Sequence, residues 1–228
     1  MTCLTGGDYL PTRGLCVPEL DTSVFRTGEV CAAEAGMITG AGVFIDTGGA
    51  VILENRIAKF KVPGKVSFDL LLEKTKRLFL PTGTRSEYLM RFLKKEDPFG
   101  TFPEMEILCG HLISNIGRGE GLTPSGDDLF LGFYTACSLF LKRSPFPEGF
   151  LSACKEGMSD ISKSEFDDIK NGFIPEFMCL YLDFLSAKER PAETMAAIKN
   201  YGHLSGEDHI AGFMLFLQNL HIFEKELK

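Results

Sequence analysis

One nine-residue pattern occurs twice in the chain, and it limits the possible folds more than any other feature. Residues 125–133 read Ser-Gly-Asp-Asp-Leu-Phe-Leu-Gly-Phe, and residues 205–213 read Ser-Gly-Glu-Asp-His-Ile-Ala-Gly-Phe. Five of the nine positions are identical. In each copy a serine, a glycine and two acids precede an apolar run, which predicts the start of a helix.

Each copy also carries a glycine four residues after its second acid, which is one turn further along the same helical face. These glycines are Gly132 and Gly212. Because glycine has no side chain, a neighbouring backbone can approach it closely. We therefore predict that the two helices cross near Gly132 and Gly212, with both N-termini facing one pocket.

A glycine-rich loop, residues 117–124, leads into the first copy. Its alternating glycines allow unusual φ values, and a helix N-terminus attracts anions through its N–H groups and its dipole. The pattern predicts an anion site with Arg118 as a clamp. The alternative is a tight connection between helices that needs glycine only for its dihedral angles. The candidate anion-binding residues are Gly117, Arg118, Gly119, Gly121, Thr123, Ser125, Gly126, Ser205 and Gly206.

The loop matches neither of the two common phosphate-binding motifs. It is not a P-loop, because no Gly-Lys-Ser/Thr follows. It is not a Rossmann fingerprint either, since the glycines alternate and residues 104–116 before them look helical. Ser125 with Asp128 three residues later has the form of a capping box, which predicts that the helix begins at Gly126 or Asp127.

The acids and histidines in and beside the two copies are candidates for metal binding or acid–base catalysis. Asp127 and Asp128 could hold Mg²⁺ or act as a general base, with the acids of the second copy completing the set. The alternative is that the helix dipole alone favours acids in a first turn. His203 and His209 could bind a metal or move a proton, or His203 lies in a turn and His209 is partly buried and neutral. The candidate catalytic residues are Asp127, Asp128, Asp208 and His203, and Asp127 and Asp128 are the candidate metal ligands.

The chain has two regions with different sequence patterns. In residues 15–62, short apolar or β-branched runs alternate with turn signals, which predicts strands in a meander or small barrel-like sheet. From residue 63 onward the patterns are helical. Strands followed by helices predict an α+β fold, with a β-rich subdomain at 1–62 packed against a helical domain at 63–228. Helices are expected near 68–80, 85–95, 104–116, 126–142, 147–157, 164–170, 173–188, 191–200 and 207–225.

Composition excludes several classes of protein. The net charge is -7 and no basic run occurs, which argues against nucleic-acid binding. The longest apolar stretch, 129–141, is too short to span a bilayer, so we expect no membrane attachment. The N-terminus lacks the features of a signal peptide. The seven cysteines are scattered without a Cys-x-x-Cys pair, which predicts a reduced, cytoplasmic protein.

The loop and the first copy together, residues 117–128 followed by a helix with Gly132, resemble the signature of the AllH-like proteins. That family includes a subunit of oxamate carbamoyltransferase. Residues 202–208 with Gly212 are similar to the family's second motif, and residues 161–164 with Gly172 are similar to a weaker helical motif. The resemblance covers most of the chain.

The resemblance implies a role in anaerobic purine or allantoin degradation. The reaction moves a carbamoyl group between oxamate and phosphate, and the family member works with other subunits, one of them similar to acyl-CoA synthetase-like proteins. The expectation is therefore an enzyme component of a multi-subunit carbamoyltransferase that binds phosphate, carbamoyl phosphate or oxamate, with Mg²⁺ as a candidate cofactor. Two alternatives remain open, a non-catalytic interaction subunit and a stand-alone enzyme acting on a related acyl or carbamoyl phosphate.

Overall fold

The computed structural model describes residues 3–6, 14–17, 32–34, 37–40, 43–46, 68–94, 101–141, 143–186 and 190–227. Contacts divide the chain into two units, Met1–Glu54 and Asn55–Lys228. Each unit is described by itself. The predicted subdomain boundary between residues 62 and 63 lies outside the described residues.

The described part of the first unit consists of short strands in two separate sheets. One is a parallel pair, and the other has three antiparallel strands in the order β3-β4-β5. Each strand is only three or four residues long. The strands are β1 (Cys3–Gly6), β2 (Gly14–Val17), β3 (Ala32–Glu34), β4 (Met37–Gly40) and β5 (Val43–Asp46).

The second unit is helical. From residue 68 onward, the described residues form no strand. The elements are α1 (Phe68–Phe79), α2 (Glu87–Lys94), α3 (Met105–Asn115), α4 (Ser125–Phe140), α5 (Phe150–Gly157), α6 (Asp160–Lys170), α7 (Glu176–Leu185), α8 (Pro191–Asn200), α9 (Ser205–Gln218) and the 3₁₀ helix η3 (Leu220–Glu226).

The predicted α+β fold class is wrong, because the described structure is predominantly helical. No single sheet or barrel forms among the described residues of the first unit. Turn signals separate apolar runs correctly, but they do not say how many runs join one sheet, and periodicity in short runs is a weak guide. The buried apolar core that the structure describes comes from the helical unit.

The helix positions expected from residue 68 onward agree with the structure to within a few residues, with one difference at the end. The predicted helix 207–225 is two elements, because α9 stops at Gln218. Asn219 is buried there, and its amide donates to the carbonyl of Leu215 at 2.9 Å and accepts from the N–H of Phe102 at 2.7 Å. This side chain ends α9 and fixes the chain that leads into α3.

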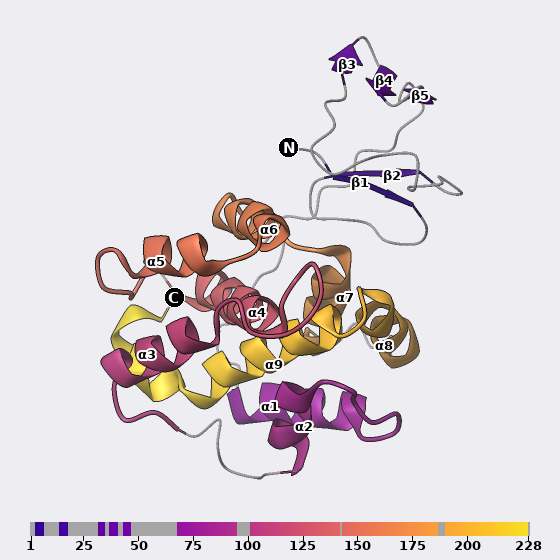
Figure 1. Cartoon of the computed structure of the whole chain (residues 1–228). Helices are drawn as coiled ribbons and strands as arrows, with labels where there is room; N and C mark the ends of the chain where they lie inside the picture. The colour runs from indigo at the N-terminus through magenta and orange to yellow at the C-terminus, as the bar shows by residue number, and fades with distance from the viewer. Residues whose placement is uncertain are drawn as a thin grey trace. The chain divides into compact units, whose positions relative to one another are not determined.

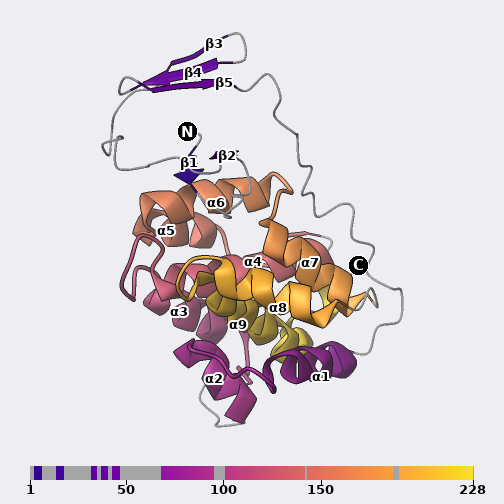
Figure 2. The ribbon, with the colours of Figure 1, turned by 90° about the vertical axis from the view of Figure 1, so that its right-hand side faces the viewer.

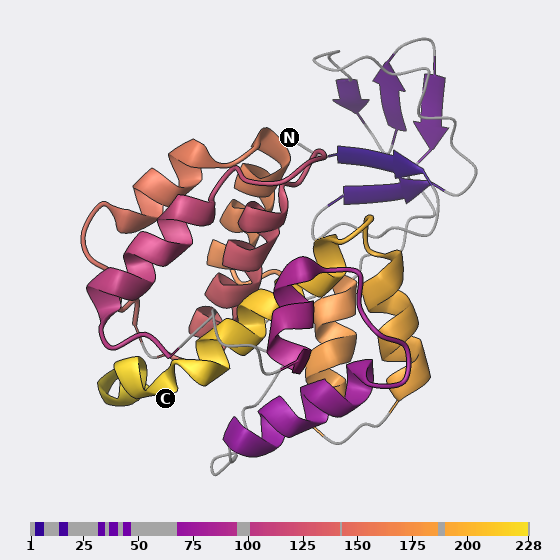
Figure 3. The same ribbon diagram turned by 60° about the horizontal axis from the view of Figure 1, so that its bottom comes forward.

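Helices α4 and α9 form the centre of the helical unit, with the other helices around them (Figures 1 and 2). Both helices are buried on nearly all sides, as expected for helices that are apolar all round. Helices α1 and α2 pack on α9, and α6 packs on α4 (Figure 3). None of the described helices has both the length and the apolar character needed to cross a membrane.

The predicted crossing of the two helices is confirmed. A Cβ atom at Gly132 would lie 1.9 Å from the carbonyl oxygen of His209, and one at Gly212 would lie 1.8 Å from that of Leu129. Both distances are far below van der Waals contact, so only glycine fits at either position. The two backbones touch at this point, and the crossing sets the distance between the two N-termini.

Candidate functional site

The two copies of the motif build the same local structure at the starts of α4 and α9. A Cβ atom at Gly126 would lie 1.7 Å from the carbonyl oxygen of Asn115, at the end of α3. A Cβ atom at Gly206 would lie 2.1 Å from that of Ile198, near the end of α8. The glycine after each serine therefore lets the first turn of a central helix rest directly on the helix before it.

The predicted capping box is absent. Helix α4 begins at Ser125 with Pro124 in the N-cap position, and no side chain caps it. The N–H of Gly126 donates to the carbonyl of Arg118 at 2.9 Å, and that of Asp127 donates to Pro124 at 2.8 Å. Because these N–H groups already have partners, the hydroxyl of Ser125 is left to bond elsewhere.

Each serine instead acts on the acid of the other copy. Hydrogen bonding from Ser205 lowers the pKa of Asp128, and hydrogen bonding from Ser125 lowers that of Asp208. The hydroxyls of Ser205 and Thr123 also lie 2.8 Å apart. The two helix N-termini therefore face each other, with serines and acids between them.

The first acid of each copy holds a neighbouring helix. Asp127 accepts the N–H of Gly117 at 2.7 Å with one carboxylate oxygen and that of Ser159, the N-cap of α6, at 2.9 Å with the other. Glu207 accepts the N–H groups of Arg85 and Ser86, just before α2, at 2.7 and 2.9 Å. A carboxylate at a helix N-terminus stabilises it, so both acids have structural contacts.

Asp127 and Asp128 are adjacent in sequence but point to different surroundings, since consecutive helical residues do not share a face. Asp127 has both oxygens bonded to backbone N–H groups. In the part of the chain that the structure describes, no group of three or more His, Cys, Asp and Glu side chains is placed to hold a metal ion. The Mg²⁺ role of Asp127 and Asp128 stays a prediction.

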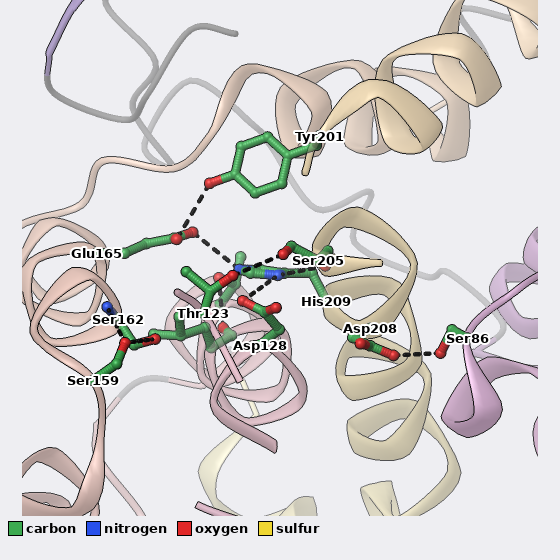
Figure 4. Close-up of polar contacts among 12 residues, drawn as sticks. Ser86, Thr123, Asp128, Ser159, Ser162, Glu165, Tyr201, Ser205, Asp208 and His209 are labelled. Atoms are coloured by element: carbon green, nitrogen blue, oxygen red, sulfur yellow. Dashed lines mark hydrogen bonds and ion pairs between the residues drawn. The ribbon is translucent and has the colours of Figure 1, made fainter. Parts of the chain in front are cut away.

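Asp128 belongs to a buried charge cluster with His209 and Glu165 (Figure 4). The Nδ1 atom of His209 lies 2.8 Å from the carbonyl oxygen of Ser205 and 3.7 Å from Oδ1 of Asp128, and its Nε2 lies 2.9 Å from Oε1 of Glu165. Carbonyl and carboxylate oxygens only accept hydrogen bonds, so both ring nitrogens donate. This geometry is that of an imidazolium.

Electrostatics agree with that geometry. Burial lowers the pKa of His209, but the charge of Glu165, its hydrogen bond and the charge of Asp128 raise the value to about 9. The neutral His209 expected from the sequence is therefore wrong. Burial also raises the pKa of Asp128 to about 8, although His209 opposes the rise. Tyr201 completes the cluster by donating to Oε2 of Glu165 at 3.2 Å.

Asp208 has different neighbours (Figure 4). Its Oδ1 accepts a hydrogen bond from the hydroxyl of Ser86. Its Oδ2 is buried and has no hydrogen-bond partner among the described residues. Burial raises the pKa of Asp208 to about 6, while the hydroxyls of Ser86 and Ser125 lower it. Asp208 is therefore ionised at neutral pH, with one oxygen unpaired.

Tyr88 of α2 connects Asp208 with the glycine loop. Its hydroxyl donates to the side-chain oxygen of Asn115, the last residue of α3, at 3.1 Å. Burial and the charge of Asp208 raise the pKa of Tyr88, and the charge of Arg118 lowers it. The charges of Asp208 and Arg118 thus both act on this one phenol.

The glycine loop is exposed, and Gly117, Gly119 and Gly121 have φ values of +73°, +114° and +101°. The N–H groups of residues 119–122 have no hydrogen-bond partner in the described structure. Neither does the guanidinium of Arg118, which is exposed. Donors for an anion therefore lie in the loop itself, since the first N–H groups of α4 are already bonded.

His203, a candidate catalytic residue, lies exposed in the turn before α9. Its carbonyl oxygen accepts from Arg85 at 2.9 Å. Among the described residues its ring makes no contact with Asp128 or Asp208, so the structure does not gather the four candidate catalytic residues at one point.

Sequence reasoning missed Glu165, Ser86 and Tyr88. Glu165 had a detectable signal, because Ser162, Glu165, Phe166 and Ile169 share one face of α6 and all four are buried. An acid on an otherwise apolar face indicates a buried partner. Ser86 had a weaker one, as a serine just before a helical pattern. Nothing local in the sequence connects Ser86 with Asp208.

Residues 115–217 match the model of the family described as oxamate carbamoyltransferase subunit AllH. The matched segment contains the glycine loop, both copies of the motif and α6. The resemblance to the AllH-like family is thereby confirmed over these residues. No curated protein and no solved structure matches the chain.

Proposed function

Because the chain carries an AllH-family segment at residues 115–217, we propose that it is a subunit of an oxamate carbamoyltransferase-like complex. In this proposal the glycine loop binds the small anion of the reaction, from the class of oxamate, phosphate and carbamoyl phosphate. Other carbamoyltransferase subunits complete the enzyme, as the word subunit in the family's description implies.

One observation supports the anion site most strongly. The guanidinium of Arg118 and the N–H groups of residues 119–122 point to no partner among the described residues, although they lie together in one short loop. Successive N–H groups in such turns form concave sites for anions, and arginine binds carboxylate and phosphate in a two-pronged manner. The loop therefore offers what a small anion needs.

The same donors suit the chemistry of carbamoyl transfer. Negative charge develops on the carbonyl oxygen when a nucleophile attacks the carbamoyl carbon, and fixed N–H donors with Arg118 would stabilise it. Among the predicted acids, Asp128 and Asp208 each have one buried carboxylate oxygen without a hydrogen bond in the described structure, and that of Asp128 lies 3.7 Å from the imidazole of His209. We assign the acid or base role to Asp208, since Asp127 is bonded to two backbone N–H groups.

A thermal-shift experiment on the purified chain tests the anion site. A ligand at about 100 times its dissociation constant stabilises by roughly 2.7 kcal/mol, which raises the melting temperature by roughly 5–10 °C for a chain of this size. We expect this with oxamate or carbamoyl phosphate, with and without Mg²⁺, and we expect Arg118→Ala to abolish it. Arg77→Ala, in an exposed position of α1, is the control. An unchanged shift in Arg118→Ala would contradict the proposed site.

A second candidate function rests on Leu122. This side chain is 77% exposed at the tip of the loop, which favours a loop that docks on a partner subunit. Leu122→Ser would then weaken assembly of the complex, measured by size-exclusion chromatography with the partner subunits, while leaving the thermal shift by anions unchanged. Loss of the thermal shift with normal assembly would favour the anion site instead.

A further inference from the structure

We propose that Asp208 recognises an N–H group of the ligand, so that the site selects small anions that carry a carbamoyl or carboxamide NH₂. The negative end of the ligand binds the loop and Arg118, and its NH₂ donates to Oδ2 of Asp208. This inference rests on the proposed function, because that proposal places the anion at the loop.

The unpaired oxygen of Asp208 carries the inference. Asp208 is 1% exposed, and its Oδ2 is buried without a hydrogen bond in the described structure. Buried polar atoms are almost always hydrogen-bonded in native proteins, so an exception calls for a reason. The other oxygen already accepts from Ser86, which fixes the carboxylate and leaves Oδ2 with room for one donor.

Asp208 has no close ion pair in the described structure, although the charge of His209 lowers its pKa. No ion pair of Asp208 exists among the described residues, whereas Asp128 has His209 at 3.7 Å. The position of His209 in the second copy corresponds to Leu129 in the first copy. A leucine brings no charge, so Asp208 has no counterpart of the close ion pair of Asp128. In this inference a ligand at the loop supplies a donor to its Oδ2.

The neighbours of Asp208 point toward the anion site. Ser125, whose hydroxyl lowers the pKa of Asp208, is the first residue of α4, directly after the glycine loop. The charge of Asp208 raises the pKa of Tyr88, and the charge of Arg118 lowers it. The charges of an acceptor and of a cation therefore both act on one phenol, as a ligand with a donor at one end and a negative charge at the other would require.

The arrangement also rejects the wrong ligands. An anion with only oxygen atoms, such as oxalate, would place an acceptor against the carboxylate of Asp208, and the two would repel. A site built around a hydrogen bond discriminates strongly against analogues that lack the donor, because a buried group is left unpaired. Oxamate and oxalate are nearly the same shape, and oxalate has a negatively charged oxygen where oxamate has its NH₂.

Calorimetric titration with oxamate and oxalate near pH 7.5 tests the inference. Wild type should bind oxamate at least about tenfold more tightly than oxalate, a difference of about 1.4 kcal/mol. In Asp208→Asn, the amide presents a donor in place of an acceptor, so the preference should shrink to near unity or reverse. Asp160→Asn, at an exposed acid of α6, is the matched control and should keep the wild-type preference.

N,N-dimethyloxamate gives a second measurement that needs no variant. It keeps the negative charge and the carbonyl but has no N–H, so wild type should bind it at least about tenfold more weakly than oxamate. Oxalate, which also lacks the N–H but adds no methyl groups, separates the missing donor from the added bulk. N,N-dimethyloxamate in turn keeps the single negative charge of oxamate, which oxalate does not.

The outcomes separate the two proposals. If both anions bind through Arg118 but with equal affinity in wild type, or if Asp208→Asn keeps the preference, then the inference is wrong and the anion site stands. If neither anion binds, or if binding persists in Arg118→Ala, then the proposed site is wrong and the inference falls with it.

Discussion

The two copies of the Ser-Gly-acid-acid motif share a backbone but differ in electrostatics. In both, a glycine rests on the preceding helix and the first acid holds a neighbouring helix. The second acids diverge. Each has one buried oxygen without a hydrogen bond, but that of Asp128 lies 3.7 Å from the buried imidazolium of His209, whereas Asp208 accepts from the hydroxyl of Ser86 and has no ion pair among the described residues.

One substitution accounts for much of this difference. The residue after the second acid is Leu129 in the first copy and His209 in the second. Because the helices cross, His209 reaches the acid of the other copy, and Glu165 of α6 completes the compensation of its charge. The comparison teaches that a repeated motif can provide a structural ion cluster at one place and a candidate ligand site at the other.

The largest expected effect comes from breaking the feature that the copies share. Gly132→Ala should destabilise the protein by at least about 3 kcal/mol, the upper end of overpacking costs, because its Cβ would collide with the backbone of His209. Chemical denaturation measures the loss. Gly110→Ala in α3, where a Cβ meets nothing within 4 Å, is the control, and it should gain up to about 1 kcal/mol of helix propensity. Equal stability of the two variants would contradict the close crossing.

The next effect concerns the ion cluster of the first copy. Glu165→Gln should cost about 3 kcal/mol of unfolding free energy, as expected when a buried charge loses its partner, because His209 is 0% exposed. The pKa of His209, followed by NMR, should fall at the same time. Glu156→Gln on the exposed side of α5 is the control. A cluster that tolerates Glu165→Gln without either change would not contain an imidazolium.

The same cluster predicts how stability depends on pH. The pKa of His209 is about 9 in the folded protein against an ordinary value of 6.5. A raised folded pKa stabilises fully below the unfolded value, and the contribution is lost as pH rises through the folded value. The raised pKa of Asp128 acts in the same direction through about 8. Unfolding free energy should therefore fall by up to about 3 kcal/mol between pH 6.5 and pH 9.

Urea titrations at a series of pH values measure this loss, and His209→Gln should flatten the profile. The loss of free energy in wild type should appear between pH 6.5 and pH 9, from the ordinary to the raised pKa of His209. A wild-type profile that is flat over this range, or that matches His209→Gln, would show that His209 is not ionised in the folded state.

The smallest expected effect tests whether Asp127 has a structural role and no role in ligand binding. Asp127→Asn should cost about 1–2 kcal/mol, since one oxygen that accepts a backbone N–H becomes a donor. The loss should appear in the melting temperature, and the ratio of oxamate to oxalate affinity should stay at its wild-type value. A changed ratio of oxamate to oxalate affinity with unchanged stability would show that Asp127 belongs to the ligand site.

The sequence predicted what depends on local patterns. Helical periodicity located α1 to α9, and two glycines at matched positions predicted the crossing of α4 and α9, which the structure confirms. The α+β class was wrong, since short apolar runs between turn signals do not define a sheet. The capping box was wrong because the carbonyl of Pro124 already accepts the N–H groups of Asp127 and Asp128 that Ser125 would cap.

The candidate site was predictable only in part, because its partners come from distant parts of the chain. The acids and serines of both copies were identified, but which acid serves which purpose depends on contacts far apart in sequence. Ser86 and Asp208 are 122 positions apart, and Glu165 and His209 are 44 apart. No spacing rule joins such residues. The charge of His209 followed from its acceptors, which only the fold reveals.

The most direct test of the central claim is to titrate the side-chain carboxyl groups of Asp128 and Asp208 by carbon-13 NMR, with and without saturating oxamate. If Asp208 receives the NH₂ of the ligand, its pKa falls below about 6 when oxamate binds, because a hydrogen bond to the charged form favours it. Asp128, compensated by His209, keeps its pKa. A bound state in which the pKa of Asp128 moves instead, or in which neither pKa moves, would contradict the division of roles between the two copies.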